Sequence, residues 1–135
     1  RIESLMTNVI PHLKENKMVI LDRYYPSTVA YSALHGFDIQ ELLLLNKRIA
    51  IEPDLIIFLD INPEIAYKRI TARNKKLSFY EQIDTLHKIN KNYKTILPFL
   101  PAFAIPTNQP IPNIVNILTT FLEAIFENKN SLKIL

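Results

Sequence analysis

Two short apolar segments constrain the fold of this chain most strongly. Residues 18–21 and residues 55–59 are unbroken runs of apolar side chains, and each ends directly on an aspartate, Asp22 or Asp60. Unbroken apolar runs of this length are typical of strands buried on both faces of a parallel sheet. In such sheets ligands bind outside the carboxyl ends of the strands, which is where the two aspartates would lie.

Helical spacing of apolar residues precedes, separates and follows the two runs. Pro26 suits the first turn of a helix, and Gly36 suits the left-handed position that ends one. Asp38 with Glu41, and Asn62 before a proline, are start signals for two further helices. The patterns predict helices over residues 2–13, 26–35, 38–49, 62–70, 78–97 and 112–128, and a third strand over residues 102–105.

Strands that alternate with helices favour an α/β fold in which helices cover both faces of a parallel sheet. We expect the 135 residues to form a single domain, and their hydrophobic content of 48% allows a real core. The formal net charge of +3 is too weak to indicate a nucleic-acid partner. The apolar runs are too short to cross a membrane, so we expect a cytoplasmic protein.

The chain contains one glycine and no cysteine. A phosphate-binding loop of the GxxxxGK[ST] or GxGxxG type needs several glycines, so this chain holds no such loop. The absence of cysteine excludes disulfides, thiolate zinc sites and cysteine nucleophiles. The chain opens on Arg1 within a helical pattern, and we expect it to be a fragment whose start is missing.

Polar side chains gather where the first apolar run ends, at Asp22, Arg23 and Tyr24. Thr28 and Tyr31 follow on one face of the next predicted helix. Arg23 can bind a phosphate through two parallel hydrogen bonds, and Asp22 can hold a metal-bound water or fix Arg23. The alternative is an Asp–Arg pair that braces the end of the strand, with Tyr31 as a packing residue.

A second group of cations follows the helix that begins near residue 62. Arg69 and Arg73 share a helical face and lead into a polar stretch with Lys75 and Lys76. Cations on a polar loop near the edge of a sheet suit a lid that closes over phosphates, here about residues 73–79. The alternative is a solvated helix end, where the helix dipole favours positive charge.

The three histidines do not indicate a catalytic site. Each of His12, His35 and His87 has an acidic residue three positions away, which is common on helix surfaces. Ser27 has no base beside it in the sequence, so nucleophilic catalysis is not supported. We interpret the histidines as structural or surface groups.

Residues 19–32 resemble the DRY-x-x-S-x-x-A-Y segment of thymidylate kinases. Residues 53–66 are similar to the P-D-x-x-x-x-L-D-x-x-P-E-x-A segment of the same family, and the match extends over roughly residues 1–127. The resemblance implies the fold of the P-loop nucleoside monophosphate kinases without its first strand and P-loop. It also implies transfer of the γ-phosphoryl group of ATP to dTMP with Mg²⁺, and a homodimer packed through helices.

The resemblance carries roles over to individual residues. It implies that the dTMP site contains Arg1, Arg23, Tyr24, Thr28, Tyr31 and Tyr93. It implies that catalysis depends on Asp22, Arg23 and Arg73, with Asp22 reaching Mg²⁺ through water. It implies that the ATP side contains Arg69 and Arg73.

Two other functions stay open at this stage. One is another P-loop nucleotide or deoxynucleoside kinase, because such enzymes also place an acidic residue and an arginine at this strand end. The other is a truncated, non-catalytic module that binds or dimerises. We expect the 135 residues alone to be inactive, because they hold no cradle for the ATP phosphates.

Overall fold

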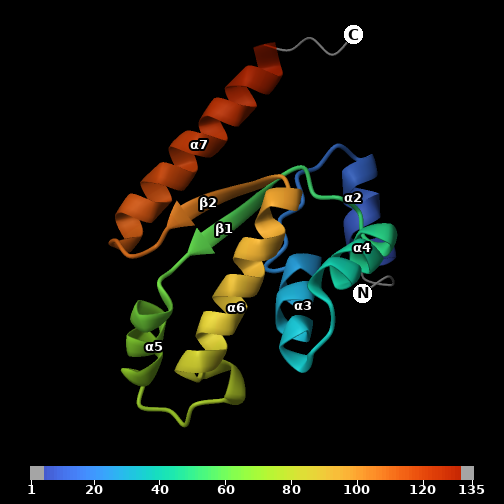
Figure 1. Ribbon diagram of the computed structural model, residues 1–135. Coiled ribbons are helices and arrows are strands. Elements are labelled where there is room, and N and C mark those ends of the chain that lie inside the picture. Colours follow the sequence, from blue (N-terminus) through green and yellow to red (C-terminus); the bar gives the residue numbers. More distant parts are fainter. Residues whose placement is uncertain (1–4, 132–135) are drawn as a thin grey trace. The chain divides into compact units, whose positions relative to one another are not determined.

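The computed structural model describes residues 5–131 (Figure 1). The chain divides into two compact units, each built from two stretches of sequence. Unit 1 contains residues 5–54 and 87–100, and unit 2 contains residues 55–86 and 101–131. Helix α6 (Ile83–Ile96) begins in unit 2 and ends in unit 1.

Unit 1 is helical. Its elements are the π-helical turn η1 (Leu5–Val9), α2 (Ile10–Lys14), α3 (Tyr25–Ser32), the 3₁₀ turn η2 (Ala33–His35), α4 (Ile39–Ile49), most of α6 and the 3₁₀ turn η4 (Leu97–Phe99). Pro11 lies in the first turn of α2, where the regular hydrogen bonding changes from π to α. Gly36 ends η2 with a φ of +87°, as predicted for the only glycine.

The core of unit 1 lies between α3, α4 and α6. Its buried members are Tyr25, Val29, Leu43 and Ile96. Tyr25 and Val29 lie one helical turn apart on α3, so they present one apolar face. The Asp38 carboxylate accepts a hydrogen bond of 2.8 Å from the Glu41 N–H and caps α4, which confirms the predicted start of that helix.

The strand predicted over residues 18–21 is wrong. These residues belong to no regular element, and the Ile20 side chain is 83% exposed. A strand exists only through hydrogen bonds to a neighbouring strand, and in the described part of the chain the sheet contains β1 and β2 alone. The apolar run therefore predicted a buried strand, whereas Met18, Ile20 and Leu21 are exposed.

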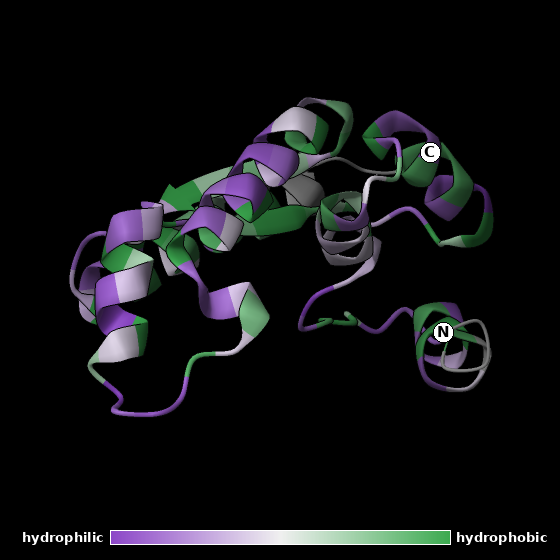
Figure 2. Ribbon diagram, turned by 60° about the horizontal axis from the view of Figure 1, so that its bottom comes forward, coloured by the Kyte–Doolittle hydropathy of each residue, from purple (hydrophilic) through white to green (hydrophobic). Residues whose placement is uncertain are grey.

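Unit 2 contains the sheet. Strand β1 (Ile56–Asp60) pairs in parallel with β2 (Ala102–Pro106), and the register aligns Ile56 with Ala102 and Asp60 with Pro106. Both strands were predicted, and Figure 2 shows the paired arrows as almost wholly hydrophobic. The other elements are α5 (Pro63–Thr71), the 3₁₀ turn η3 (Phe79–Glu81), the first turn of α6 and α7 (Ile111–Ser131).

The helices of unit 2 follow their predicted signals, with one correction. Asn62 caps α5 by accepting a 2.8 Å hydrogen bond from the Glu64 N–H. The helix predicted from residue 78 instead begins at Ile83, because Ser78 and Glu81 close a capping box around η3 and the chain is extended at Gln82. Among the described helices, none has the length and apolar content needed to cross a lipid bilayer.

Helix α7 packs on the sheet through stacked aromatic rings. The Phe121 ring lies parallel to the Phe103 ring of β2, with 3.8 Å between the centroids and 7° between the planes. Phe121 lies within the helix predicted over residues 112–128. The α/β architecture, a parallel sheet with flanking helices, is the predicted one.

Candidate functional site

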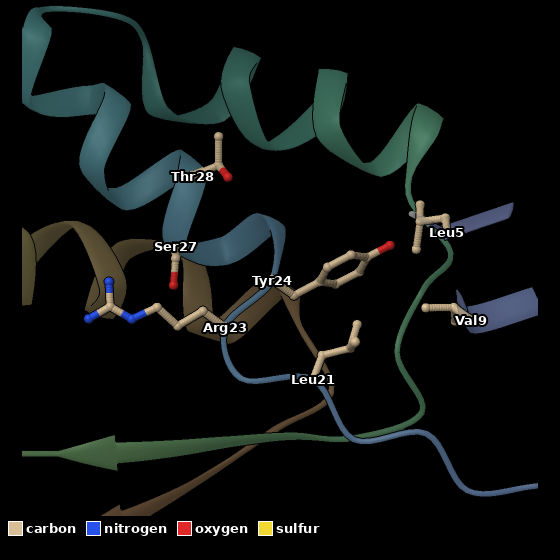
Figure 3. Close-up of a pocket in the computed structure, with 7 residues that line it drawn as sticks. All are labelled: Leu5, Val9, Leu21, Arg23, Tyr24, Ser27 and Thr28. Atoms are coloured by element: carbon tan, nitrogen blue, oxygen red, sulfur yellow. The ribbon is translucent and has the colours of Figure 1, made fainter. Parts of the chain in front are cut away.

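A cavity of about 340 Å³ lies in unit 1 beside the N-terminus of α3. One part of its wall is apolar, and another carries a guanidinium group and three side chains with hydroxyl groups. The lining residues are Leu5, Val9, Leu21, Arg23, Tyr24, Ser27 and Thr28 (Figure 3).

Local sequence places the polar wall at the start of a helix. Pro26 lies in the first turn of α3, and the Ser27 N–H donates to the Tyr24 carbonyl oxygen at 3.0 Å. Arg23 therefore stands just before the helix, and Ser27 and Thr28 stand in its first turn. This end of a helix carries partial positive charge and favours an anionic ligand.

Arg23 is exposed and lies against Tyr31. Its Cζ atom is 5.5 Å from the centroid of the Tyr31 ring, within the range of a cation–π contact. Among residues 5–131, neither Asp22 nor Arg23 forms an ion pair, so the alternative of a bracing Asp–Arg pair is not what the structure contains. Figure 3 shows the Arg23 side chain extending away from Leu5 and Val9.

Tyr93 of α6 completes the polar side. Its hydroxyl oxygen and Ser27 Oγ share a hydrogen bond of 2.7 Å. Burial raises the pKa of Tyr93, and Tyr31 adds to the rise, while the Ser27 hydrogen bond and Arg23 oppose it. Tyr93 is therefore neutral near pH 7 and can act as a hydrogen-bond donor beside the cavity.

Tyr24 forms part of the wall through its ring. Its hydroxyl oxygen accepts a hydrogen bond of 3.1 Å from the Ile51 N–H, so this oxygen already has a partner within the protein. A second tie holds α6 against α3: Asn92 Nδ2 donates to the Ala30 carbonyl oxygen at 2.8 Å. Tyr24 is thus oriented by the backbone N–H of Ile51, and Tyr93 is oriented by Ser27 of the cavity wall.

The predicted cations of the ATP side lie in unit 2. Arg69 donates a hydrogen bond of 3.0 Å to the carbonyl oxygen of Thr107, just beyond the end of β2. Thr107 in turn donates its N–H and its hydroxyl to the Asp60 carbonyl oxygen, at 2.7 and 2.9 Å. Arg73 is exposed and pairs with Glu81 at 2.9 Å.

The structure brings five of the predicted residues together in unit 1, namely Arg23, Tyr24, Thr28, Tyr31 and Tyr93. Asp22 is exposed and does not line the cavity, and Arg1 lies outside the described residues. The apolar wall was not predicted as part of the site, because its pattern does not distinguish a ligand cavity from an ordinary core. Ser27 was considered as a nucleophile and was not supported as one, and its bond to Tyr93 had no signal in the sequence.

No group of three or more acidic or histidine side chains that could hold a metal ion occurs in the described part of the chain. Mg²⁺ commonly keeps several waters and takes one or two carboxylates together with substrate phosphates. The exposed Asp22 carboxylate fits that limited part, acting through water.

Comparison with known proteins gives one consistent result. A family model described as thymidylate kinase matches residues 1–117. A probable thymidylate kinase of Staphylothermus marinus is 39% identical over 93 residues, which are 69% of this chain and 46% of the relative. A probable thymidylate kinase of Archaeoglobus fulgidus is 43% identical over 84 residues, or 62% and 42% of the two chains.

A thymidylate kinase of Clostridium novyi is 34% identical over 132 residues, which are 91% of this chain and 64% of the relative. The chain thus spans about half the length of the curated relatives it matches. A solved structure, a deoxyadenosine kinase from M. mycoides with bound dCTP, matches with a TM-score of 0.62 at 16% identity. It covers 91% of this chain and 79% of that one, and it supports the fold.

Proposed function

Since the chain belongs to the thymidylate kinase family, we propose that the protein containing it transfers the γ-phosphoryl group of ATP to dTMP. The observation that carries the proposal is the position of Arg23. Its guanidinium lies over the Tyr31 ring beside a cavity at a helix N-terminus, and it is exposed. A planar cation with five N–H donors in that place suits a phosphate monoester.

The dTMP molecule is proposed to bind with its phosphate at Arg23 and its nucleoside along the polar side of the cavity. Tyr31 packs near the deoxyribose, and Thr28 faces the base. Tyr93 flanks the nucleotide and is held by Ser27. Arg1, whose contact with the thymine edge the resemblance implies, belongs to the same proposal.

ATP is proposed to bind on the side of Arg69 and Arg73. Arg69 is fixed at the end of β2 by Thr107, a position suited to packing beside the adenine. Arg73 leaves Glu81 to reach the transferred phosphate when the lid closes. Mg²⁺, when bound to the ATP phosphates, neutralises their charge, and Asp22 reaches it through water.

Phosphoryl transfer depends on positioned substrates and stabilising charges, and it needs no covalent nucleophile from the protein. A phosphate oxygen of dTMP attacks the γ-phosphorus of ATP, the bond from that phosphorus to the bridging oxygen breaks, and ADP leaves with the electron pair. Arg23 holds the attacking phosphate in line, and Arg73 stabilises charge that develops on the transferred group.

The test is a competition assay on the protein that contains this chain. Purified protein is given ATP with dTMP, dUMP, dCMP and thymidine, and the phosphorylated products are separated. We expect dTDP as the main product. Phosphorylation of thymidine but not of dTMP would refute the proposal in favour of a deoxynucleoside kinase, and no transfer to any acceptor would favour a binding module.

The protein is further proposed to be a cytoplasmic homodimer. Support for the dimer comes from α4, where Leu44, Leu45 and Ile49 are 55%, 49% and 57% exposed. Covering such side chains on a second copy removes apolar surface from water. Light scattering on the purified protein measures the molar mass, and a monomer at micromolar concentration would refute the dimer.

A further inference from the structure

Arg23 has a backbone conformation that residues with a Cβ rarely adopt. Its φ is +63°, in the left-handed region where a side chain crowds the backbone. Residues other than glycine stay in that region only where the surrounding structure holds them. Arg23 belongs to no helix or strand, so the contacts of the residues beside it must hold it.

The two tyrosines that follow Arg23 are tied to adjacent residues of one loop. The Tyr24 hydroxyl accepts the hydrogen bond from the Ile51 N–H. The Tyr25 hydroxyl donates to Glu52 Oε1 at 3.2 Å, and the Tyr25 residue is fully buried. Two successive side chains anchored on successive loop residues fix the direction in which the chain leaves Arg23.

Glu52 is itself held in place. Lys47 Nζ of α4 lies 3.2 Å from the same oxygen that Tyr25 contacts. Lys47 also donates a hydrogen bond of 2.9 Å to the Phe99 carbonyl oxygen in η4. The Glu52 carboxylate thus contacts α3 through Tyr25 and α4 through Lys47, and Lys47 connects it to η4.

We propose that Glu52 is a positioning residue for Arg23. Through Tyr25 it holds the turn before α3, so that the guanidinium lies over Tyr31 beside the cavity. The consequence for dTMP binding rests on the proposed function. The position of Arg23 itself can be measured without a substrate.

The first measurement is an NMR spectrum of the Arg23 Nε–H group in the 135-residue chain. The Tyr31 ring shifts this resonance by its ring current, and the Tyr31→Leu variant gives the value without the ring. We expect Glu52→Ala and Tyr25→Phe to move the resonance toward that value. Glu52→Gln keeps an acceptor for the tyrosine and is expected to keep most of the shift, while Glu41→Ala on exposed α4 surface is the unchanged control.

The second measurement is the dissociation constant for dTMP. We expect Glu52→Ala to raise it about tenfold and Glu52→Gln to raise it less. An Arg23 resonance that stays in place in both Glu52→Ala and Tyr25→Phe overturns the proposal. An unchanged dTMP affinity alongside a moved resonance supports the positioning role of Glu52 and contradicts the proposed contact of Arg23 with dTMP. If Glu52→Ala does not fold, Tyr25→Phe decides alone. A wild-type chain that binds no dTMP contradicts the proposed function, and the resonance still decides the role of Glu52.

Discussion

At the scale of single residues, Arg23 joins an exposed guanidinium to a strained backbone position. Arg23→Ala removes the group proposed to bind the dTMP phosphate. We expect kcat/KM for dTMP to fall by an amount equal to about 2–4 kcal/mol of transition-state stabilisation, as when one preorganised donor is lost. The free energy of unfolding should change little, because the side chain is exposed. Steady-state kinetics and thermal unfolding of the same variant measure the two quantities.

Two variants control this experiment. Arg48→Ala removes an exposed arginine from α4 and is expected to leave kcat/KM unchanged. Arg23→Lys keeps the charge but not the paired donors, so its kcat/KM should lie between those of the wild type and the alanine variant. Wild-type kinetics in Arg23→Ala would contradict the phosphate-binding role.

Tyr25 gives a prediction about pH. Burial, and after it the Glu52 carboxylate, raise the pKa of Tyr25 well above its ordinary value of 10.0. A group whose pKa is higher in the folded state stabilises the fold below its unfolded pKa, and this contribution is lost as the pH rises toward the folded value. We therefore expect the free energy of unfolding to fall above about pH 10, and less steeply in Tyr25→Phe. Denaturant titrations across this range test the slope, with exposed Tyr80→Phe as the control, and equal slopes in all three proteins would contradict the assignment.

Residue patterns predicted which side chains gather at the site but not which of them touch. Arg23, Thr28 and Tyr31 were recognised because polar groups directly follow an apolar run. The contact of Arg23 with Tyr31 rather than with Asp22 depends on the left-handed φ of Arg23, which no local signal indicates in a residue other than glycine. The pairing of Ser27 with Tyr93 depends on how α3 packs on α6, and sequence spacing carries no information on that.

At the scale of elements, helix ends were predictable because capping is local. Asp38 caps α4 through the Glu41 N–H. We expect Asp38→Ala to lower the free energy of unfolding by about 1 kcal/mol. Asp38→Asn keeps the acceptor and should lose only a fraction of that, and Asp54→Ala in an exposed loop is the matched control. Chemical denaturation measures all three, and a loss in Asp54→Ala as large as in Asp38→Ala would argue against a capping effect.

Strands were less predictable than helices, because a strand depends on a partner distant in sequence. The segments predicted over residues 55–59 and 102–105 pair with each other, and both form strands. Residues 18–21 carry the same apolar signal but have no ladder among the described residues. The hydrophobic pattern thus reports what a segment can bury, while the hydrogen bonds that make it a strand depend on its neighbours.

Helix α7 is held to β2 by the stacked pair Phe103 and Phe121. Phe121→Leu keeps an apolar side chain but loses the ring contact. We expect unit 2 to lose about 1 kcal/mol of stability and the amide hydrogens of α7 to exchange faster. Phe126→Leu on the exposed side of α7 is the control. Equal exchange rates in the two variants would show that the stacked rings do not hold the helix.

At the scale of the whole molecule, the residues proposed for the acceptor side and those proposed for the ATP side belong to different units. The Arg23 cavity lies in unit 1, whereas Arg69 and Arg73 lie in unit 2. The α/β class followed from the alternation of apolar runs with helical patterns. The sequence patterns did not predict that each unit is built from two separate stretches of the chain. Residues 87–100 belong to unit 1 because α6 packs on α3, not because they are near it in sequence.

This division predicts that the 135-residue chain binds dTMP but does not phosphorylate it. The cavity proposed to bind dTMP is built within one unit, whereas the ATP phosphates need a row of backbone N–H groups from a glycine-rich loop. The only glycine of the chain, Gly36, ends η2 and cannot form such a loop. Calorimetry with dTMP should therefore give a binding signal, while a coupled assay for ADP should give none. Turnover by the purified chain would contradict the second expectation.

Thymidine is dTMP without its phosphate, so a comparison of the two affinities measures what the phosphate contributes to binding. It offers the same nucleoside to the cavity but no anion to Arg23, so dTMP should bind the wild-type chain more tightly than thymidine does. In Arg23→Ala the two affinities should converge, because the variant loses a contact that only dTMP makes. If the preference for dTMP over thymidine persisted in that variant, a cation other than Arg23 would bind the phosphate. The partial charge of the helix N-terminus is too weak to account for the whole preference.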